Sequence, residues 1–248
     1  MFLVDSDYYR NPYFCSNTAQ YMQFTYYGHS CFLIDIKGTK LLFDPFISGN
    51  ELANKVVDVN SIQADYILVS HGHADHTIDL VPVADRTGAE VICSWEIYEW
   101  LGKQNITKVH PMNTGGKWNF GPFTVKCVSA QHSSGLPDGS YGGNPMGFIV
   151  TSEEGNFYYS GDTALTMDMQ LIPHWAALKF AILPIGDNFT MDVADAVQCA
   201  GMVKCNQIIG VHYDTFGYIK IDHAAAKKAF AASGSMLHLL DIGETINL

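Results

Sequence analysis

The sequence predicts an α/β (α+β) protein in which two mixed β-sheets pack face to face and helices cover their outer faces. A β-rich stretch followed by an alternation of strand and helix patterns occurs twice, over 22–110 and again over 116–240. Each half would supply one sheet with an apolar face, and packing the two sheets together buries both faces. A chain of 248 residues with 48% hydrophobic content can bury a large core. No linker divides it, so we expect a single domain over 22–248.

The elements are predicted from hydrophobic periodicity and from the turn residues that separate them. In the first half we expect strands at 22–27, 31–36, 40–44, 64–70, 90–93 and 108–110, and helices at 78–86 and 95–104. In the second half 116–160 is β-rich, with a Gly/Pro-rich loop at 133–145, and helices at 167–178, 193–203 and 224–232 alternate with strands at 180–184, 207–211 and 236–240. Pro173 should kink or break the first of these helices.

The first 21 residues mix acidic and aromatic side chains and lack the basic start and apolar centre of a secretory signal. We expect 1–21 to be an N-terminal extension that packs loosely, because the first convincing strand opens at Met22.

Composition excludes several classes of partner. The formal charge is −11, from 14 basic and 25 acidic residues, and no block of Lys or Arg suggests binding of nucleic acid. No apolar run of about 18 residues predicts a membrane span. The six cysteines form no CxxC pair and lie in apolar stretches, which is typical of buried, reduced thiols in a cytoplasmic protein. A homo-oligomer is compatible with this composition.

The most informative motif is His71-Gly72-His73-Ala74-Asp75-His76, which directly follows an apolar run at 64–70. Imidazole nitrogen and carboxylate oxygen are the ligands that Zn²⁺ and its neighbours prefer. His71 and His73 project to one side of an extended backbone. Asp75 and His76 follow at a turn and point elsewhere, so the motif predicts two metal ions. The alternative is a histidine-rich surface turn.

This motif resembles the signature of the metallo-β-lactamase-fold hydrolases. That family expects three further ligands downstream, and His132, Asp162 and His212 each end an apolar β-type run, as the motif itself does. The resemblance implies a four-layer αβ/βα sandwich. It also implies one metal on His71, His73 and His132, a second on Asp75, His76 and His212, and Asp162 as a bridge between them.

The chemistry that follows is hydrolysis. A water shared by two divalent ions would lose a proton near neutral pH, since one bound Zn²⁺ already lowers the pKa of water to about 7. Two divalent ions contribute a charge of about +4, and the hydroxide with two carboxylates contributes about −3, which leaves a net charge of about +1 at the site. We therefore expect a small anionic ester, lactone or phosphodiester as substrate. Zinc is the expected metal, and manganese, iron or nickel would suit the same ligands.

Comparison among branches of the family favours hydrolysis over other activities. A di-iron, dioxygen-reducing branch of the family is expected to carry Glu where this chain has His73. Lactamases commonly place Cys in the second metal site, and no cysteine of this chain follows a strand in a ligand position. The chain is most similar to the bacterial metal-dependent hydrolases that include ascorbate-6-phosphate lactonase and N-acyl-phosphatidylethanolamine phospholipase D relatives. The likeness rests on 28–32, 44–46, 70–76, 160–163 and 184–191, so it covers most of the chain from Met22 onward.

Asp75, His29 and Asp187 are the candidate catalytic residues, and His29, Asp187 and Thr190 the candidate substrate contacts. His29 lies in a tight turn, where it would either face the metals as a proton donor or substrate contact, or make local hydrogen bonds. Asp187 and Thr190 follow a strand at the edge where ligands gather and precede a helix. The alternative is a structural role, since capping of this helix alone would explain Thr190 or Asp192.

Two questions stay open at this level. The loop 133–145 is either a lid over the site or a plain connection. The second functional hypothesis is a metal-stabilised scaffold or sensor that binds an anion without turnover, and a β-lactamase or a nuclease is a weaker alternative.

Overall fold

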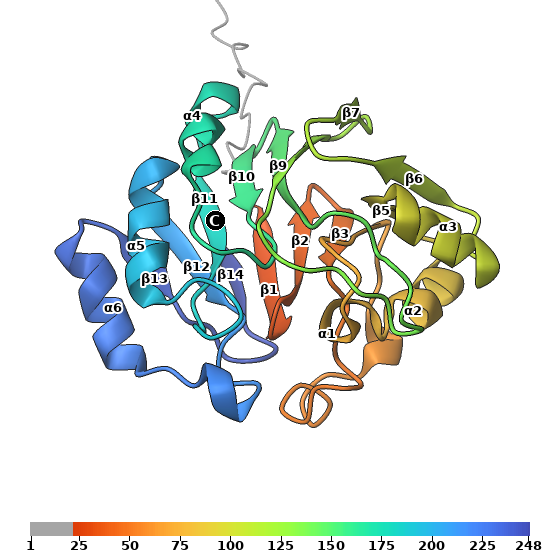
Figure 1. Cartoon of the computed structure of the whole chain (residues 1–248), viewed down its shortest axis with the longest axis horizontal. Coiled ribbons are helices and arrows are strands. Elements are labelled where there is room, and N and C mark those ends of the chain that lie inside the picture. Colours follow the sequence, from red (N-terminus) through yellow and green to blue (C-terminus); the bar gives the residue numbers. More distant parts are fainter. Residues whose placement is uncertain (1–21) are drawn as a thin grey trace, which may run out of the picture.

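Two seven-stranded mixed β-sheets lie against each other and carry helices on their outer faces (Figure 1). The computed structural model describes residues 22–248, and the predicted N-terminal extension at 1–21 lies outside the described residues. Helices α2 (Leu80–Thr87) and α3 (Trp95–Lys103) cover one sheet, and α4 (Ile172–Trp175), α5 (Val193–Met202) and α6 (His223–Ala232) cover the other. The expected four-layer arrangement is therefore confirmed.

The first sheet has the strand order β14-β1-β2-β3-β4-β5-β6. Its strands are β1 (Gln23–Gly28), β2 (Cys31–Ile36), β3 (Thr39–Phe43), β4 (Tyr66–Leu68), β5 (Glu90–Ser94), β6 (Val109–Met112) and β14 (Thr245–Asn247). Strands β14 to β3 pair antiparallel, whereas β3 to β6 pair parallel. Short helical turns α1 (Ala74–Thr77) and η1 (Val59–Ser61) lie in the connections of this half.

The second sheet has the order β13-β12-β11-β10-β9-β8-β7. Its strands are β7 (Lys117–Asn119), β8 (Thr124–Ser129), β9 (Met146–Ser152), β10 (Gly155–Tyr159), β11 (Phe180–Pro184), β12 (Gln207–Val211) and β13 (Met236–His238). Strands β10 to β13 pair parallel, and β8 runs in the same direction because two antiparallel pairings separate it from β10. The carboxyl ends of β8, β10 and β12 therefore meet at one edge.

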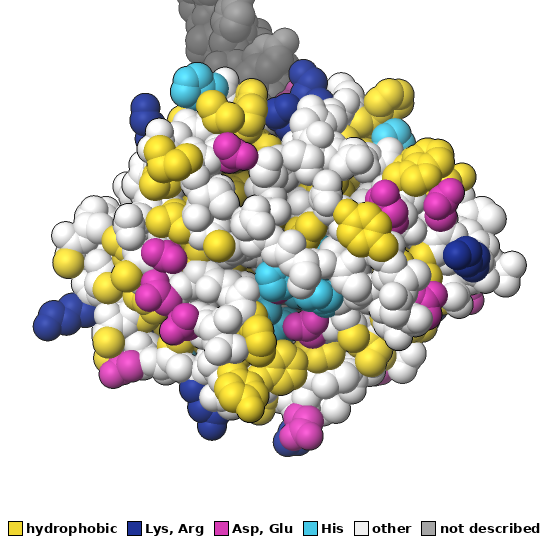
Figure 2. Space-filling model, in the orientation of Figure 1, with side chains coloured by type: hydrophobic (Ala, Val, Ile, Leu, Met, Phe, Trp, Pro, Cys, Tyr) yellow, Lys and Arg dark blue, Asp and Glu magenta, His cyan; other side chains and the backbone are white. Residues whose placement is uncertain are grey.

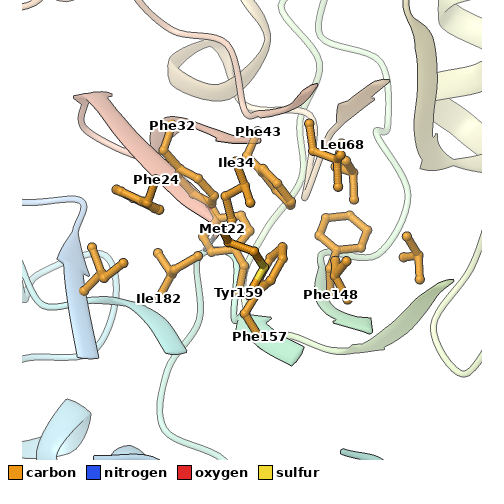
Figure 3. Packing of buried hydrophobic residues seen from close by; sticks show 14 of the residues in the cluster. Met22, Phe24, Phe32, Ile34, Phe43, Leu68, Phe148, Phe157, Tyr159 and Ile182 are labelled. Atoms are coloured by element: carbon orange, nitrogen blue, oxygen red, sulfur yellow. The ribbon is translucent and has the colours of Figure 1, made fainter. Parts of the chain in front are cut away.

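The period-2 pattern of the strands explains the layers. In β2, Phe32 and Ile34 belong to the core between the sheets, whereas Cys31 and Leu33 belong to the core beneath α2 and α3. Figure 3 shows Phe24, Phe32, Ile34, Phe43 and Leu68 of the first sheet facing Phe148, Phe157, Tyr159 and Ile182 of the second. A third core, which includes Phe230 of α6, lies under the helices of the second sheet.

Two details differ from the expectation. The predicted helix at 167–178 is a 3-10 turn, η2 (Met167–Leu171), followed by the short α4, in which Pro173 stands in the first turn. Pro is accepted there because the backbone N–H that it lacks has no intrahelical partner at a helix start. Strand β14 was not predicted, because three residues with one apolar side chain give no periodic pattern. These residues form a strand because they pair with β1.

No helix of residues 22–248 is long and apolar enough to cross a membrane. Five cysteines in this part of the chain, Cys31, Cys93, Cys127, Cys199 and Cys205, are buried and free.

Candidate metal centre and active-site cavity

The side chains predicted as metal ligands converge at the shared edge of the two sheets. They are His71, His73, Asp75, His76, His132, Asp162 and His212. Their nitrogen and oxygen atoms form three overlapping groups, in each of which the atoms lie within 4.8 Å of one another. The groups are His71, His73 and His132; His71, His76 and Asp162; and Asp75, His76 and His212 together with His29. Figure 2 shows histidines gathered at the centre of one face of the molecule.

The start of a helix splits the His71 motif into two diverging pairs. His73 has an extended backbone and is the N-cap of α1, while Asp75 and His76 stand in its single turn. The Thr77 hydroxyl donates to the His73 carbonyl oxygen over 2.9 Å, which fixes this turn. The divergence expected from the sequence therefore has a local cause, namely the switch from extended to helical backbone at His73.

Asp162 lies between the two sets of histidines. Its Oδ2 atom is 2.9 Å from Nε2 of His212 and 3.1 Å from Nε2 of His76. The same oxygen is 3.8 Å from Nε2 of His132 and 3.9 Å from Nε2 of His71. One carboxylate oxygen is thus within reach of both predicted metal positions, as a bridging ligand requires.

The donor set fits divalent metal ions. Within the described part of the chain, Asp162 Oδ1 and His212 Nδ1 are buried and have no hydrogen-bond partner. Buried polar atoms without a partner are costly, and such an atom in a native structure commonly marks an ion or a catalytic role. Imidazoles and carboxylates in tight groups are the ligands that Zn²⁺ and similar cations take.

The electrostatic state of these groups also suits cations. Burial lowers the pKa of His71 well below its usual value, and burial likewise lowers the pKa of His73 and His132. Burial alone would lower the pKa of His76, but the carboxylates of Asp162 and Asp44 on its two sides raise this pKa well above its usual value. The surroundings of His76 therefore favour positive charge, and the other three imidazoles are held in the neutral form that binds metal.

Asp44 organises two of the histidines, a role that the sequence did not reveal. Its fully buried Oδ2 accepts hydrogen bonds from Ser70 Oγ at 2.6 Å, Tyr159 Oη at 2.6 Å and His76 Nδ1 at 2.9 Å. Because the Ser70 hydroxyl proton goes to Asp44, Ser70 Oγ accepts from His71 Nδ1 over 3.0 Å. Both histidines thus have a proton on Nδ1 and direct Nε2 to the predicted metal positions.

His29 is buried and supports Asp75. Its Nε2 donates to Asp75 Oδ2 over 3.1 Å, and its Nδ1 accepts from Thr215 Oγ1 over 3.0 Å. Burial, with the neighbouring His212, lowers the pKa of His29 to about 4, so the ring is neutral near pH 7. Burial would raise the pKa of Asp75, but the hydrogen bond from His29 and the charge of His76 lower it. His29 is 1% exposed, and this geometry makes it a partner of Asp75 or a fourth donor to the second metal.

Three residues at the histidine and aspartate cluster have left-handed backbones. The φ angles of His29, Asp44 and His212 are 56°, 41° and 56°. Such conformations cost roughly 1–3 kcal/mol in non-glycine residues and cluster at functional sites. Gly186 makes the turn at His212 possible, because a Cβ there would lie 2.1 Å from the His212 carbonyl oxygen.

The loop 133–145 is anchored to the body of the domain. Ser134 Oγ accepts from Gly72 N over 3.0 Å, Asp138 accepts from Trp100 Nε1 over 3.1 Å, and Leu136 is buried in the core beneath α3. Ser133 is the residue of this loop that lines the cavity. The loop therefore supports Gly72 inside the metal motif, and its anchored position gives the lid hypothesis no support.

Asp187 and Thr190 belong to the turn before α5 and do not line the cavity. Asp187 is exposed and accepts from Asn188 N over 2.6 Å, and α5 is capped by Asp192, whose carboxylate accepts from Asp195 N over 2.7 Å. Phe189, between the two predicted residues, does line the cavity. An exposed aromatic residue in a turn gave no signal that sequence reasoning could use.

A cavity of about 1040 Å³ opens above the predicted metal ligands. Its floor includes His73, Asp75, His132, Asp162 and His212. One wall comes from the loop after β3, with Gly49, Glu51 and Leu52, and the other comes from Phe189 and the segment 214–218 with Lys220. A volume of this size suits a small-molecule substrate.

Comparison with known proteins agrees with this geometry. A family model described as the β-lactamase superfamily domain matches residues 39–213. The chain belongs to this superfamily. A protein from Christiangramia forsetii, described as a UPF0173 metal-dependent hydrolase, is 50% identical over 227 residues, which is 92% of this chain and 100% of the relative. A UPF0173 metal-dependent hydrolase from Flavobacterium johnsoniae is 48% identical with the same coverage.

Among solved structures, Igni18, a metallo hydrolase from the archaeon Ignicoccus hospitalis, aligns with a TM-score of 0.83 and 28% identity over 92% of this chain and 98% of that one. The protein is thus a metal-dependent hydrolase of the metallo-β-lactamase superfamily, and the family predicted from the sequence is confirmed.

Proposed function

We propose that the protein is a dinuclear hydrolase of a small anionic ester, lactone or phosphodiester. The observation that carries this proposal is the position of Asp162 Oδ2, within 3.9 Å of Nε2 of His71 and His132 and within 3.1 Å of Nε2 of His76 and His212. His71, His73 and His132 would hold one divalent ion, Asp75, His76 and His212 the other, and Asp162 both. Zinc is the metal we expect, and manganese, iron or nickel would suit the same ligands.

When bound, two divalent ions lower the pKa of a shared water and polarise the bond to be cleaved. The residues of the chain prepare this chemistry. Asp44 and Ser70 fix the Nε2 atoms of His76 and His71, and His29 fixes the carboxylate of Asp75. In the overall reaction the water oxygen bonds to the carbonyl carbon or phosphorus, and the leaving oxygen departs with the bonding electron pair and takes up a proton.

The charge of the centre supports an anionic substrate. Two divalent ions, two carboxylates and a hydroxide sum to about +1. On the cavity walls the positive charge of Lys220 is offset by Glu51, and Asp214 accepts a hydrogen bond from His223 Nε2 over 2.6 Å, so the charge argument rests on the metal centre itself. Asp187 and Thr190 would act indirectly by holding the turn that carries Phe189, since Asp187 Oδ1 accepts from Asn188 N over 2.6 Å and Thr190 Oγ1 donates to the Met191 carbonyl oxygen over 3.5 Å. The buried free thiols support placing the protein in the cytoplasm.

The test combines metal content with turnover. Protein purified without added metal would be examined by elemental analysis and assayed on a phosphodiester, a thioester, a lactone and a β-lactam. We expect about two transition-metal ions per chain and chelator-sensitive hydrolysis of one substrate class. Asp162→Ala should lose both, and His174→Ala, an exposed histidine outside the site, should lose neither.

The outcomes separate the hypotheses. Stoichiometric metal with tight anion binding but no turnover on any of the four substrates would favour a scaffold or sensor. One metal ion per chain after reconstitution would contradict the dinuclear assignment. Normal turnover in Asp162→Ala would show that the bridging role is wrong.

A further inference from the structure

The mouth of the active-site cavity carries apolar side chains that the metal chemistry does not explain. Leu52, Phe189 and Tyr218 are 45%, 50% and 78% exposed, and all three line this cavity. They come from three loops far apart in the sequence: after β3, after β11 and between β12 and α6. Figure 2 shows hydrophobic side chains directly beside the histidines on this face. Exposed apolar groups that gather around one opening commonly mark a binding surface.

Phe216 continues the apolar surface inward to the metal ligands. It lines the cavity, and its ring centroid lies 5.3 Å from that of His29 and 6.3 Å from that of buried Phe46. At the rim, the rings of Phe189 and Tyr218 meet edge to face at 6.4 Å. An apolar group of a substrate could therefore stay in contact with aromatic side chains from the rim to the reacting centre.

Hydrogen bonds hold this aromatic wall in place. Asp214 N donates to the Ile219 carbonyl oxygen over 2.8 Å, and Asp214 Oδ1 accepts from Ile221 N over 3.1 Å, so the segment 214–221 is closed on itself. Thr215 Oγ1 donates to His29 Nδ1 over 3.0 Å and ties the segment to the partner of Asp75. A wall that is already ordered loses little entropy when a ligand binds.

We propose that the substrate carries an aryl or branched alkyl group next to the bond that is cleaved, and that Phe189, Phe216, Tyr218 and Leu52 bind this group. This inference rests on the proposed function, since it places the reacting atoms at the His and Asp cluster. It adds that the substrate is amphipathic: its anionic or ester end faces the metals and Lys220, and its apolar end packs along the aromatic wall.

Non-hydrolysable probes test the apolar site independently of turnover. Methylphosphonate and phenylphosphonate would be titrated calorimetrically into the metal-loaded protein. Phenylphosphonate should bind about tenfold more tightly or better, because burial of a ring of this size removes substantial apolar surface from water. The double variant with Phe189→Ser and Tyr218→Ser should lose most of this preference and bind methylphosphonate as the original chain does.

Trp118→Ser is the matched control. Trp118 is 54% exposed, lies on β7 and does not line the cavity, so its removal should leave the preference unchanged. Equal binding of the two phosphonates, or an equal effect of the control and the double variant at unchanged Tm, would overturn the apolar site even if hydrolysis is found. A preference for phenylphosphonate without turnover on any ester would support the apolar site and count against the proposed hydrolysis alone.

Discussion

Removal of the Tyr159 hydroxyl group should weaken metal binding at the predicted centre. Tyr159 is fully buried in β10, and its Oη donates to Asp44 Oδ2 over 2.6 Å. Burial, together with the carboxylates of Asp44 and Asp162, raises the pKa of Tyr159 well above its usual value, so the hydroxyl keeps its proton and acts as a donor. Tyr159→Phe would delete one of the three hydrogen bonds at the oxygen that orients His76.

The size of the effect follows from the acceptor. A hydrogen bond to a charged group contributes about 1.5–3 kcal/mol, and the loss leaves a buried carboxylate less well compensated. For a chain of this size about 1 kcal/mol shifts Tm by roughly 2–4 °C, so we expect Tm to fall by about 3–12 °C. Metal affinity should fall about 10–100-fold, the usual effect of a residue that supports a ligand.

Tyr158→Phe is a control on the same strand. Tyr158 is equally buried, but within residues 22–248 its hydroxyl has no hydrogen-bond partner, so its removal should leave metal affinity unchanged and Tm equal or higher. Both variants would be compared by thermal unfolding with and without metal and by competition with a chelating dye. Equal losses of metal affinity in the two variants would refute the assignment of Asp44 as the residue that orients His76.

The other predictions concern the ligands, the metals and the start of the chain. Asp162→Ala should lower kcat/KM by more than about a hundredfold, beyond the loss from a supporting residue, and retained activity in steady-state assays would contradict the bridging role. Removal of metal by a chelator should lower the free energy of unfolding by about 2.7 kcal/mol relative to protein with metal at 100 times Kd; an unchanged Tm would exclude structural coupling to the site. His29→Gln should reduce kcat about 10–100-fold without abolishing metal binding, and loss of one metal ion by elemental analysis would instead make His29 a ligand. A chain that begins at Met22 should keep its Tm and its turnover, because Met22 is itself buried in the core between the sheets and its backbone pairs with that of Leu248; loss of folding on truncation would contradict this prediction.

Much of the fold could be predicted because the signals are local. Alternation in β2 places Phe32 and Leu33 on opposite faces, and the observed strand has the predicted bounds of 31–36. The His71 motif is likewise a local signal, because its residue types and their spacing lie within six consecutive positions. No local signal predicts β14. Its three residues form a strand because they pair with β1, which lies far away in the sequence.

The sequence by itself predicted which side chains would form the metal cluster and which strand ends would carry them. Only the tertiary structure decided how these ligands are oriented and what surrounds them. Asp44 and Tyr159 are 115 positions apart, and His29 and Thr215 are 186 apart. Hydrogen bonds over such separations exist because the two sheets bring distant strand ends to one edge, and no periodicity in the chain encodes them. The aromatic wall around Phe216 has the same origin, since loops without any regular pattern meet there only after the sheets have packed.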